Sequence, residues 1–314
     1  MHPVGRGTVL RDRYRLLAPL GRGAMGQVWE GLDTHLERSV AVKLLVADLL
    51  ADDAEGSRVH QRFEREAKAA AALDHVNVAT VYDADITSGT YWLAMQLVRG
   101  ATLGDLLGEH AAFGVDAATA VAAQLCAGLS AAHAVGLVHR DLKPANVMVR
   151  TDGVVKILDF GLVKPLAADA TRLTVTGEEM GTAAYSAPEV LTGEHEADVR
   201  SDLYSLGCLL YQLLTGAPPF PAEQPARLLR QRLTGPPPAP EEHGVTVPDA
   251  VARLLARLMA PAARDRPESA ACVYDALRPF LPRQQDGSSP ATHSGPEDPR
   301  RPFTLPMSPY PYPS

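Results

Sequence analysis

The chain has 314 residues, of which 46% are hydrophobic and 21% charged, and its formal net charge is −7 at pH 7. These values are typical of a globular protein that is long enough for one large domain or two lobes. The acidic balance argues against a general nucleic-acid or anionic-membrane binder, so we expect no nucleic-acid partner.

The cysteines and the apolar stretches indicate in which cellular compartment the protein is located. Three widely spaced cysteines without a CxxC pair give no disulfide framework, which suits the reducing cytosol. The first residues lack the long apolar segment of a secretory signal. We expect the longest apolar-rich stretch at residues 203–214, and it is too short and too interrupted to cross a bilayer. We therefore expect a cytoplasmic protein without a membrane span.

The predicted elements change character along the chain. Runs rich in β-forming residues occupy 13–20, 27–32, 39–46, 78–85 and 91–98, and one helical pattern interrupts them at 58–73. Helical patterns then dominate, at 116–136, 201–215, 248–259 and 268–277. We therefore predict an α+β fold with an N-terminal extension (1–13), a strand-rich N-lobe (14–98) and a helix-rich C-lobe (99–280).

Residues 281–314 form the last predicted segment. They hold nine of the 26 prolines of the chain, together with Ser, Gly and Asp. A segment of this composition buries too little apolar surface to fold by itself, which predicts a disordered or extended tail.

A glycine-rich motif, Gly21-Arg-Gly23-Ala-Met-Gly26-Gln-Val28, lies between the first two predicted strands. Glycines let backbone amides approach a phosphate closely, but dinucleotide-binding folds use the same spacing, with a helix directly after it. Here a strand pattern follows, at residues 27–32. The context favours a β-hairpin that covers a nucleotide.

Two charged residues lie in apolar surroundings. Lys43 belongs to the strand pattern at 39–46, and Glu66 shares a helix face with Phe63 and Ala67. A charge in such a position is costly unless it is paired. We therefore predict an ion pair between Lys43 and Glu66, in preference to an exposed Glu66. The basic residues of the helix are expected on its solvated surface: Arg62, Arg65 and Lys68.

Two further motifs follow at short separation, HRDLKPAN at 139–146 and DFG at 159–161. Each alone is commonly a charged loop or a turn, but their order and spacing indicate one site. Phosphoryl transfer needs a carboxylate that positions the acceptor hydroxyl and hard oxygen ligands for Mg²⁺. Asp141, Asn146 and Asp159 supply that set.

With these motifs together, residues 14–280 resemble the eukaryotic-like (Hanks-type) Ser/Thr protein kinases of bacteria. The resemblance implies ATP and Mg²⁺ (or Mn²⁺) as cofactors and proteins with Ser or Thr as substrates, and it allows a homodimer through the N-lobe. It places these residues near the nucleotide: Leu20, Gly21, Gly23, Gly26, Val28, Ala41, Lys43, Glu66, the gatekeeper Met95, and Gln96 to Val98 as the adenine-facing hinge.

The resemblance also assigns roles in the C-lobe. Asp141 would be the catalytic base, and Lys143 would steady the moving phosphoryl group. Asn146 and Asp159 would hold Mg²⁺, while His139 would brace the loop rather than act as a base. The DLKPAN form around Lys143 is typical of Ser/Thr rather than Tyr kinases.

Further implied roles concern the segment after the DFG motif. Thr182 would help to seat the substrate hydroxyl, and Glu189 would pair with Arg266. Asp202 would bond the backbone of the catalytic loop, and it would also suit the positive end of a helix.

The same segment contains candidate phosphorylation sites. The resemblance favours Thr174 and Thr176 as autophosphorylated residues. Arg140, next to the catalytic Asp, would receive the phosphate through charge-assisted hydrogen bonds.

Two other classes compete with an active protein kinase. A pseudokinase scaffold would bind partners without catalysis, but such proteins commonly lack residues that are present here: Lys43, Asp141 and Asp159. A small-molecule phosphotransferase shares some of the loop chemistry. The APE motif at 187–189 closes a full activation segment and argues for a protein substrate.

Overall fold

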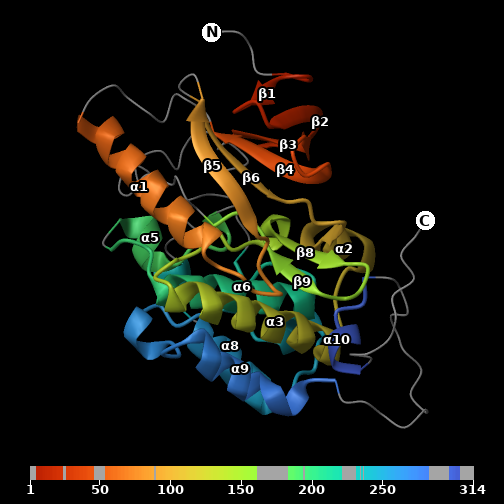
Figure 1. The fold of residues 1–314 in the computed structure, drawn as a ribbon. Coiled ribbons are helices and arrows are strands. Elements are labelled where there is room, and N and C mark those ends of the chain that lie inside the picture. The colour runs from red at the N-terminus through yellow and green to blue at the C-terminus, as the bar shows by residue number, and fades with distance from the viewer. Residues whose placement is uncertain are drawn as a thin grey trace. The chain divides into compact units, whose positions relative to one another are not determined.

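The structure is a computed structural model that describes residues 5–23, 26–45, 54–87, 90–160, 183–193, 195–220, 231–233, 235, 237–282 and 297–304. In the first helix, which begins at residue 54, the side chains are described from residue 60 onwards. The chain divides into two compact units, and it passes from the first to the second after Val98. Figure 1 labels most of the helices and strands of both units.

The first unit is an antiparallel sheet with one long helix. Its strands are β1 (Val9–Leu10), β2 (Tyr14–Gly23), β3 (Gly26–Asp33), β4 (Arg38–Leu45), β5 (Val81–Thr87) and β6 (Thr90–Gln96), in the spatial order β1-β2-β3-β4-β6-β5. Helix α1 (Ala54–Ala71) contacts β5 (Figure 1). The predicted β-rich runs overlap β2 to β6, so the strand-rich character of this unit is confirmed.

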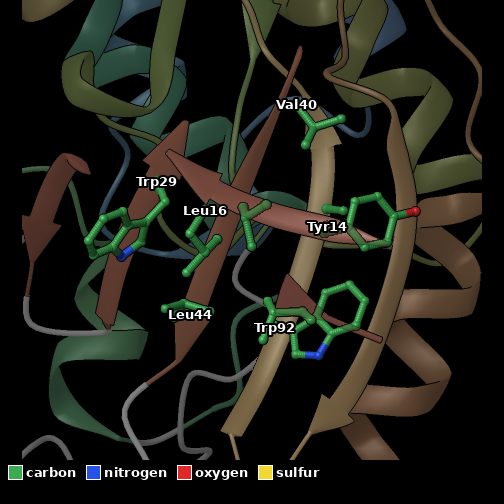
Figure 2. Packing of buried hydrophobic residues seen from close by; sticks show 9 residues of the cluster. Tyr14, Leu16, Trp29, Val40, Leu44 and Trp92 are labelled. Carbon is green, nitrogen blue, oxygen red and sulfur yellow. The ribbon is translucent and has the colours of Figure 1, made fainter. Parts of the chain in front are cut away.

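One face of this sheet carries an aromatic and aliphatic core (Figure 2). The rings of Tyr14 and Trp92 lie with their centroids 5.4 Å apart, and the indole N–H of Trp92 donates to Thr87 Oγ1 at 2.9 Å. The other buried members of the cluster are Leu10, Leu16, Trp29, Val40, Val42, Leu44 and Ala94. Burial of such side chains is the main stabilising contribution in a sheet of this kind.

Helix α1 covers the opposite face. Side chains alternate along a strand, so Tyr91 of β6 points away from the face that carries Trp92. Phe63 of α1 packs on Tyr91 with ring centroids 5.0 Å apart. The sheet therefore carries the aromatic and aliphatic core on one face, and α1 packs on the part of the other face near β5 and β6.

An ion pair fixes the end of β3. The buried carboxylate of Asp33 accepts hydrogen bonds from Arg13 Nε at 2.7 Å and Nη2 at 2.8 Å. The hydrogen bond from Arg13, aided by the N–H of Leu36, outweighs burial and lowers the pKa of Asp33 to about 2. Because this pKa lies below the value of about 3.9 in an unfolded chain, the pair stabilises the fold above that value.

We expect the first unit to lose this stabilisation as the pH falls from about 5 towards 2. The urea midpoint should therefore drop more steeply in this range for the wild type than for Asp33→Asn. Tryptophan fluorescence reports selectively on the unfolding of the first unit, since this unit contains both tryptophans, Trp29 and Trp92. The exposed Asp74→Asn variant should follow the wild type, and parallel curves for Asp33→Asn would contradict the assignment.

The second unit is mostly helical. Its helices are α2 (Leu103–His110), α3 (Val115–Ala134), α5 (Pro188–Thr192), α6 (Val199–Thr215), α8 (Asp249–Leu258), α9 (Ala270–Leu277) and α10 (Arg301–Thr304). Short 3₁₀ turns are η2 (Pro144–Asn146), η3 (Pro240–His243), η4 (Ala263–Asp265) and η5 (Arg278–Phe280). A small sheet has the order β7 (Gly100–Thr102), β8 (Val147–Arg150) and β9 (Val155–Ile157). Helix α3 contacts α6, α9 and β9, which makes it the central element (Figure 1).

Helix α3 is apolar on almost every side because the second unit packs around it. Within the described residues it is the one helix that is long and apolar enough to cross a membrane. Its apolar stretch is longer than the one expected at 203–214. However, 72% of the most apolar 18-residue stretch of α3 is buried inside the structure. Core helices of soluble proteins meet the same criterion, so this is weak support for a span.

The C-terminal segment differs in part from the predicted disordered tail. Residues 297–304 form a turn and the short helix α10, packed on the second unit. Arg300 bonds Asp116 of α3 at 2.9 Å, across 184 positions of the sequence. Composition alone cannot reveal a partner so distant in the chain.

Candidate active site

The glycine motif lies in a β-hairpin of the first unit. Strands β2 and β3 pair Gly21 with Val28 and Gly23 with Gly26, and residues 24–25 between them fall outside the described residues. A strand rather than a helix follows the last glycine. This confirms the predicted hairpin and excludes the dinucleotide-binding arrangement.

Gly26 is required by a close approach of the backbone. Its φ is +143°, and a Cβ atom added there would lie 1.8 Å from the carbonyl oxygen of Leu44 on β4. A side chain at this position would push the two strands apart, so the last glycine of the motif has a structural reason of its own.

Four residues expected near the nucleotide lie on one face of the sheet. Lys43 is opposite Val28 on β3 and Leu93 on β6, and Ala41 is opposite Met95. Directly opposed residues of antiparallel strands point to the same side. Ala41 and Met95 are buried, while Lys43 and Val28 are half-buried. This is the face that α1 covers.

Three other residues expected near ATP lie towards the strand ends. Leu20 of β2 is 52% exposed. Gln96 ends β6, and its backbone N–H donates to the carbonyl of Thr80 at 2.8 Å. Val98, the last residue of the first unit, is buried.

Glu66 is buried on α1, as its position on the apolar helix face predicts. Its Oε1 accepts a hydrogen bond from Arg62 Nε at 3.1 Å, and only 12% of the Arg62 side chain is exposed. The prediction that Arg62 lies on the solvated surface is therefore wrong, because the i,i+4 spacing brings it to Glu66. Arg65 and Lys68 are exposed. The Lys43–Glu66 pair stays a prediction.

In the second unit, Asp202 holds the backbone of the predicted catalytic loop, the HRDLKPAN motif at 139–146. Its Oδ2 accepts from the N–H of His139 and from His133 Nε2, both at 2.8 Å, and its Oδ1 accepts from the N–H of Arg140 at 2.9 Å. Arg140 has a φ of +65°, which is unfavourable for a side chain with a Cβ. The buried carboxylate at the start of α6 thus stabilises a strained turn.

His139 is completely buried and uses both ring nitrogens. Nε2 lies 2.8 Å from the carbonyl oxygen of Leu158, and Nδ1 accepts from the N–H of Asp141 at 3.2 Å. Burial lowers the pKa of His139 and outweighs the nearby charge of Asp202. The imidazole is therefore neutral, with its proton on Nε2. It packs on the Phe160 ring, with centroids 4.9 Å apart, and has no nitrogen left for proton transfer.

The catalytic loop brings three predicted residues together. Asp141 Oδ2 lies 3.1 Å from Lys143 Nζ, and 9% of the Asp141 side chain is exposed. Asn146 Nδ2 donates to the backbone oxygen of Asp141 at 2.8 Å and to Asp141 Oδ2 at 2.9 Å. Both amide protons of Asn146 are thereby used, which leaves its Oδ1 as the atom able to coordinate a metal ion.

Asn146 and Asp159 are joined by a single hairpin. Asn146 directly precedes β8, and Asp159 follows β9 after one intervening residue. The N–H of Leu158 donates to the Asn146 carbonyl at 2.9 Å, which closes this end of the hairpin. Asp159 is half-buried, and its φ of +50° directs the chain away from the strand.

The donor set fits Mg²⁺ or Mn²⁺. An amide oxygen and a carboxylate are hard ligands, and Mg²⁺ typically takes one or two protein oxygens together with phosphates and water. The described residues contain no cluster of three His, Cys, Asp or Glu that could hold a metal ion unaided. A metal ion that enters with nucleotide phosphates matches this arrangement.

Glu189 and Arg266 form a buried bidentate pair. Arg266 Nη1 and Nη2 lie 2.7 and 2.8 Å from the two Glu189 oxygens, and Ser201 Oγ donates to Glu189 Oε1 at 2.9 Å. Burial raises the pKa of Glu189, but the hydrogen bonds and charge of Arg266 outweigh it, so the pKa is lowered overall. The structure thus brings together the pair that the resemblance implies.

Arg232 also supports the segment next to this pair, and no pattern in the sequence predicts this role. The residue is 1% exposed, and its guanidinium donates to the carbonyls of Ala184 and Ser186. Ser205 Oγ of α6 donates to the carbonyl of Tyr185 at 2.8 Å. Arg232 lies in a stretch with several Arg and Leu residues, where a basic side chain normally indicates a solvated surface.

Several predicted residues fall outside the described residues. They are Thr174, Thr176 and Thr182, together with Gly161 of the DFG motif. Their roles stay predictions.

Comparison with known proteins identifies the family. The model of the protein kinase domain matches residues 14–276. The chain belongs to the protein kinase family. Membership implies the use of ATP and a divalent metal ion, and the two-unit architecture is the protein kinase fold.

The relatives of this kinase domain include bacterial protein kinases. It is 42% identical over 220 residues to the Ser/Thr-protein kinase PknB of Mycobacterium leprae, an alignment that covers 69% of this chain and 34% of PknB. The chain thus spans about a third of the length of the curated relatives that it matches. This places it with the bacterial Hanks-type kinases.

Solved structures give the same fold. The kinase domain of Mycobacterium tuberculosis PknI matches with a TM-score of 0.69 and 27% identity, over 89% of this chain and 100% of that one. Rad53 in complex with AMP-PNP matches with a TM-score of 0.68 and 26% identity, over 86% of this chain and 65% of that one.

Proposed function

We propose that this kinase domain transfers the γ-phosphate of ATP to Ser or Thr hydroxyls of proteins in bacterial signalling. The observation that supports it best is the Asp141 carboxylate, held beside Lys143 and oriented by Asn146. The similarity to bacterial proteins that are named Ser/Thr-protein kinases also supports this proposal.

Asp141 would accept a hydrogen bond from the substrate hydroxyl and orient it for in-line attack. Lys143, 3.1 Å away, would place a positive charge where negative charge develops on the transferred group. His139 would stabilise the conformation of the loop rather than transfer protons, since both of its ring nitrogens are already hydrogen-bonded.

Asn146 Oδ1 and the Asp159 carboxylate would hold the divalent metal ion, with Mg²⁺ as the expected metal. When bound, the ion neutralises charge on the phosphates of ATP. The hairpin between Asn146 and Asp159 fixes these two residues to one element, so the metal ligands would need little reorganisation on binding.

The first unit would hold the nucleotide itself. The glycine hairpin would cover the phosphates, and Lys43 would contact them while paired with Glu66. Met95 would border the adenine pocket. Since its N–H bonds Thr80, Gln96 would offer adenine only its carbonyl.

Activation would proceed by autophosphorylation of Thr174 and Thr176, with Arg140 receiving the phosphate and Thr182 seating the substrate hydroxyl. Replacing both Thr174 and Thr176 with Ala should lower both activity and bound phosphate. Unchanged values would refute this part of the proposal. The cytoplasmic location, the absence of a membrane span and the N-lobe homodimer also stay predictions.

Transfer of ³²P from labelled ATP to a generic basic protein tests the main proposal. We expect incorporation with Mg²⁺ or Mn²⁺, none with EDTA, and phosphoserine or phosphothreonine rather than phosphotyrosine after acid hydrolysis. No incorporation with either metal would overturn the enzyme assignment, and phosphotyrosine alone would overturn the acceptor class.

A further inference from the structure

Residues 297–304 dock on the second unit although they lie beyond the family match, which ends at residue 276. Pro299 and Arg300 are buried. The segment lies beside α3 (Figure 1) and makes three kinds of contact there: an ion pair, shared hydrogen bonds and a close backbone approach.

The ion pair is centred on Arg300. Its Nε and Nη2 donate to the two carboxylate oxygens of Asp298, each at 2.9 Å, and its Nη1 lies 2.9 Å from Asp116 Oδ2 of α3. Only 10% of the side chains of Arg300 and Asp298 is exposed. A planar guanidinium suits this double contact, because one edge binds within the segment and a remaining donor binds the receiving surface.

The shared hydrogen bonds run through Gln124 of α3, which is buried. Its Nε2 donates to the carbonyls of Gly153 at 3.2 Å and Pro299 at 3.1 Å, and its Oε1 accepts from the N–H of Val155 at 2.9 Å. One carboxamide thus ties three backbone segments together: the docked segment, the β8–β9 turn and the start of β9. Each bond removes a buried polar group from the unsatisfied state.

The close approach occurs at Gly153 in the β8–β9 turn. Its φ is +80°, and an added Cβ would lie 2.1 Å from the carbonyl oxygen of Asp298 and 3.0 Å from Arg301 Cβ. Glycine is therefore required at position 153 for two reasons: the turn has a positive φ, and the docked segment leaves no room for a Cβ atom. The turn belongs to the hairpin whose opposite end carries Asn146 and leads to Asp159.

We propose that Asp116, Gln124 and Gly153 form a peptide-docking site, and that its occupant is the chain's own segment 297–304. The site recognises the Asp-Pro-Arg sequence of this C-terminal latch, residues 297–304, in which Asp298 orients Arg300 towards Asp116. The docked latch fixes the turn of the hairpin that bears the candidate metal ligands. The docking itself does not depend on the proposed function.

Trypsin cleavage after Arg300 tests the latch in the full chain. The bond after Arg301 precedes a proline, so release of the peptide 301–314, followed by mass spectrometry, measures access to Arg300 alone. When opening is fast, the cleavage rate follows the population of the undocked state. We expect Gly153→Ala to raise this rate by about tenfold or more, because its Cβ displaces Asp298.

Two glycines provide matched controls. Gly136 and Gly244 have φ values of +73° and nothing within 4 Å of an added Cβ. Gly136→Ala and Gly244→Ala therefore impose the same backbone penalty without a collision, and both should keep the wild-type cleavage rate. Asp116→Asn, which leaves the turn intact, should also speed cleavage. Equal rates in all the variants and the wild type would overturn the proposal.

A labelled peptide of residues 297–304 tests the site from the other side. It should bind the full-length Arg300→Ala chain, whose own latch is released, and bind the wild type much more weakly, because the intramolecular latch competes at a high effective concentration. A peptide carrying the Arg300→Ala change should not bind. Absence of binding up to millimolar peptide, or equal binding of both peptides, would refute the site. Neither experiment requires phosphoryl transfer, so a failed kinase assay would leave both results interpretable.

Discussion

Asp141→Asn should reduce the rate of phosphate transfer to a protein acceptor by about 10²–10⁴-fold, the range typical for loss of a positioned acid–base group. The amide keeps the shape of the side chain, and its oxygen can still accept the hydrogen bond from Asn146 that now stands at 2.9 Å. It loses the negative charge that, in the proposed mechanism, would orient the acceptor hydroxyl. Initial rates at saturating ATP and Mg²⁺ measure the effect, and the KM for ATP should change little.

A matched variant separates this effect from a general loss of charge. Asp275→Asn also removes one carboxylate from the second unit, but its side chain is 69% exposed and far from the predicted site in sequence. This variant should retain wild-type rates. If Asp141→Asn transferred phosphate within a few-fold of the wild type, Asp141 would not be the catalytic base.

The sequence was most informative where a motif carries its own local geometry. The strand pattern after Gly26 distinguished a hairpin from a dinucleotide turn, because alternation and helical periodicity differ within a few residues. The buried position of Glu66 followed from helix phase in the same way. The arrangement of Asp202 and the loop at His139 came from resemblance, since no local pattern indicates a bond between residues 63 positions apart.

The sequence was least informative about buried arginines. The local composition predicts a surface position for three arginines, Arg62, Arg232 and Arg300. Each of them is instead mostly buried and bonded to a carboxylate or to backbone carbonyls. Such a side chain is recognisable only through its partner, and for Arg300 that partner is on α3. The sequence also does not predict the short strands β8 and β9, since three or four residues do not establish a period.

Arg266→Met is expected to destabilise the second unit by about 3–5 kcal/mol, the cost of leaving a buried charge without its partner. Arg266 is 2% exposed and also donates to three backbone carbonyls: those of Ala260, Pro261 and Arg200. Methionine fills much of the same volume, so the lost pairing should dominate the effect. Urea unfolding followed by far-UV circular dichroism measures it, because this unit contains most of the helices. Arg264→Met, whose side chain is 88% exposed in the wild type, should stay within about 0.5 kcal/mol of the wild type.

The pH dependence distinguishes a lost ion pair from lost packing. In the wild type, Arg266 keeps the pKa of Glu189 below its usual value, so the pair stabilises at neutral pH and is lost as the pH falls through that lowered pKa. Without Arg266, burial dominates and raises the pKa of Glu189, which favours the protonated form in the folded state. The difference between Arg266→Met and the wild type should therefore shrink as the pH is lowered from 7 towards 4.

A double variant completes the test. Glu189→Leu combined with Arg266→Met removes both charges, and an apolar pair of similar volume is often nearly as stable as a buried ion pair. The double variant should thus be more stable than Arg266→Met alone, and its stability should vary less with pH. If the double variant were instead less stable than either single variant and the pH dependence were unchanged, packing and the backbone contacts of Arg266, rather than its charge, would hold this part of the kinase fold together.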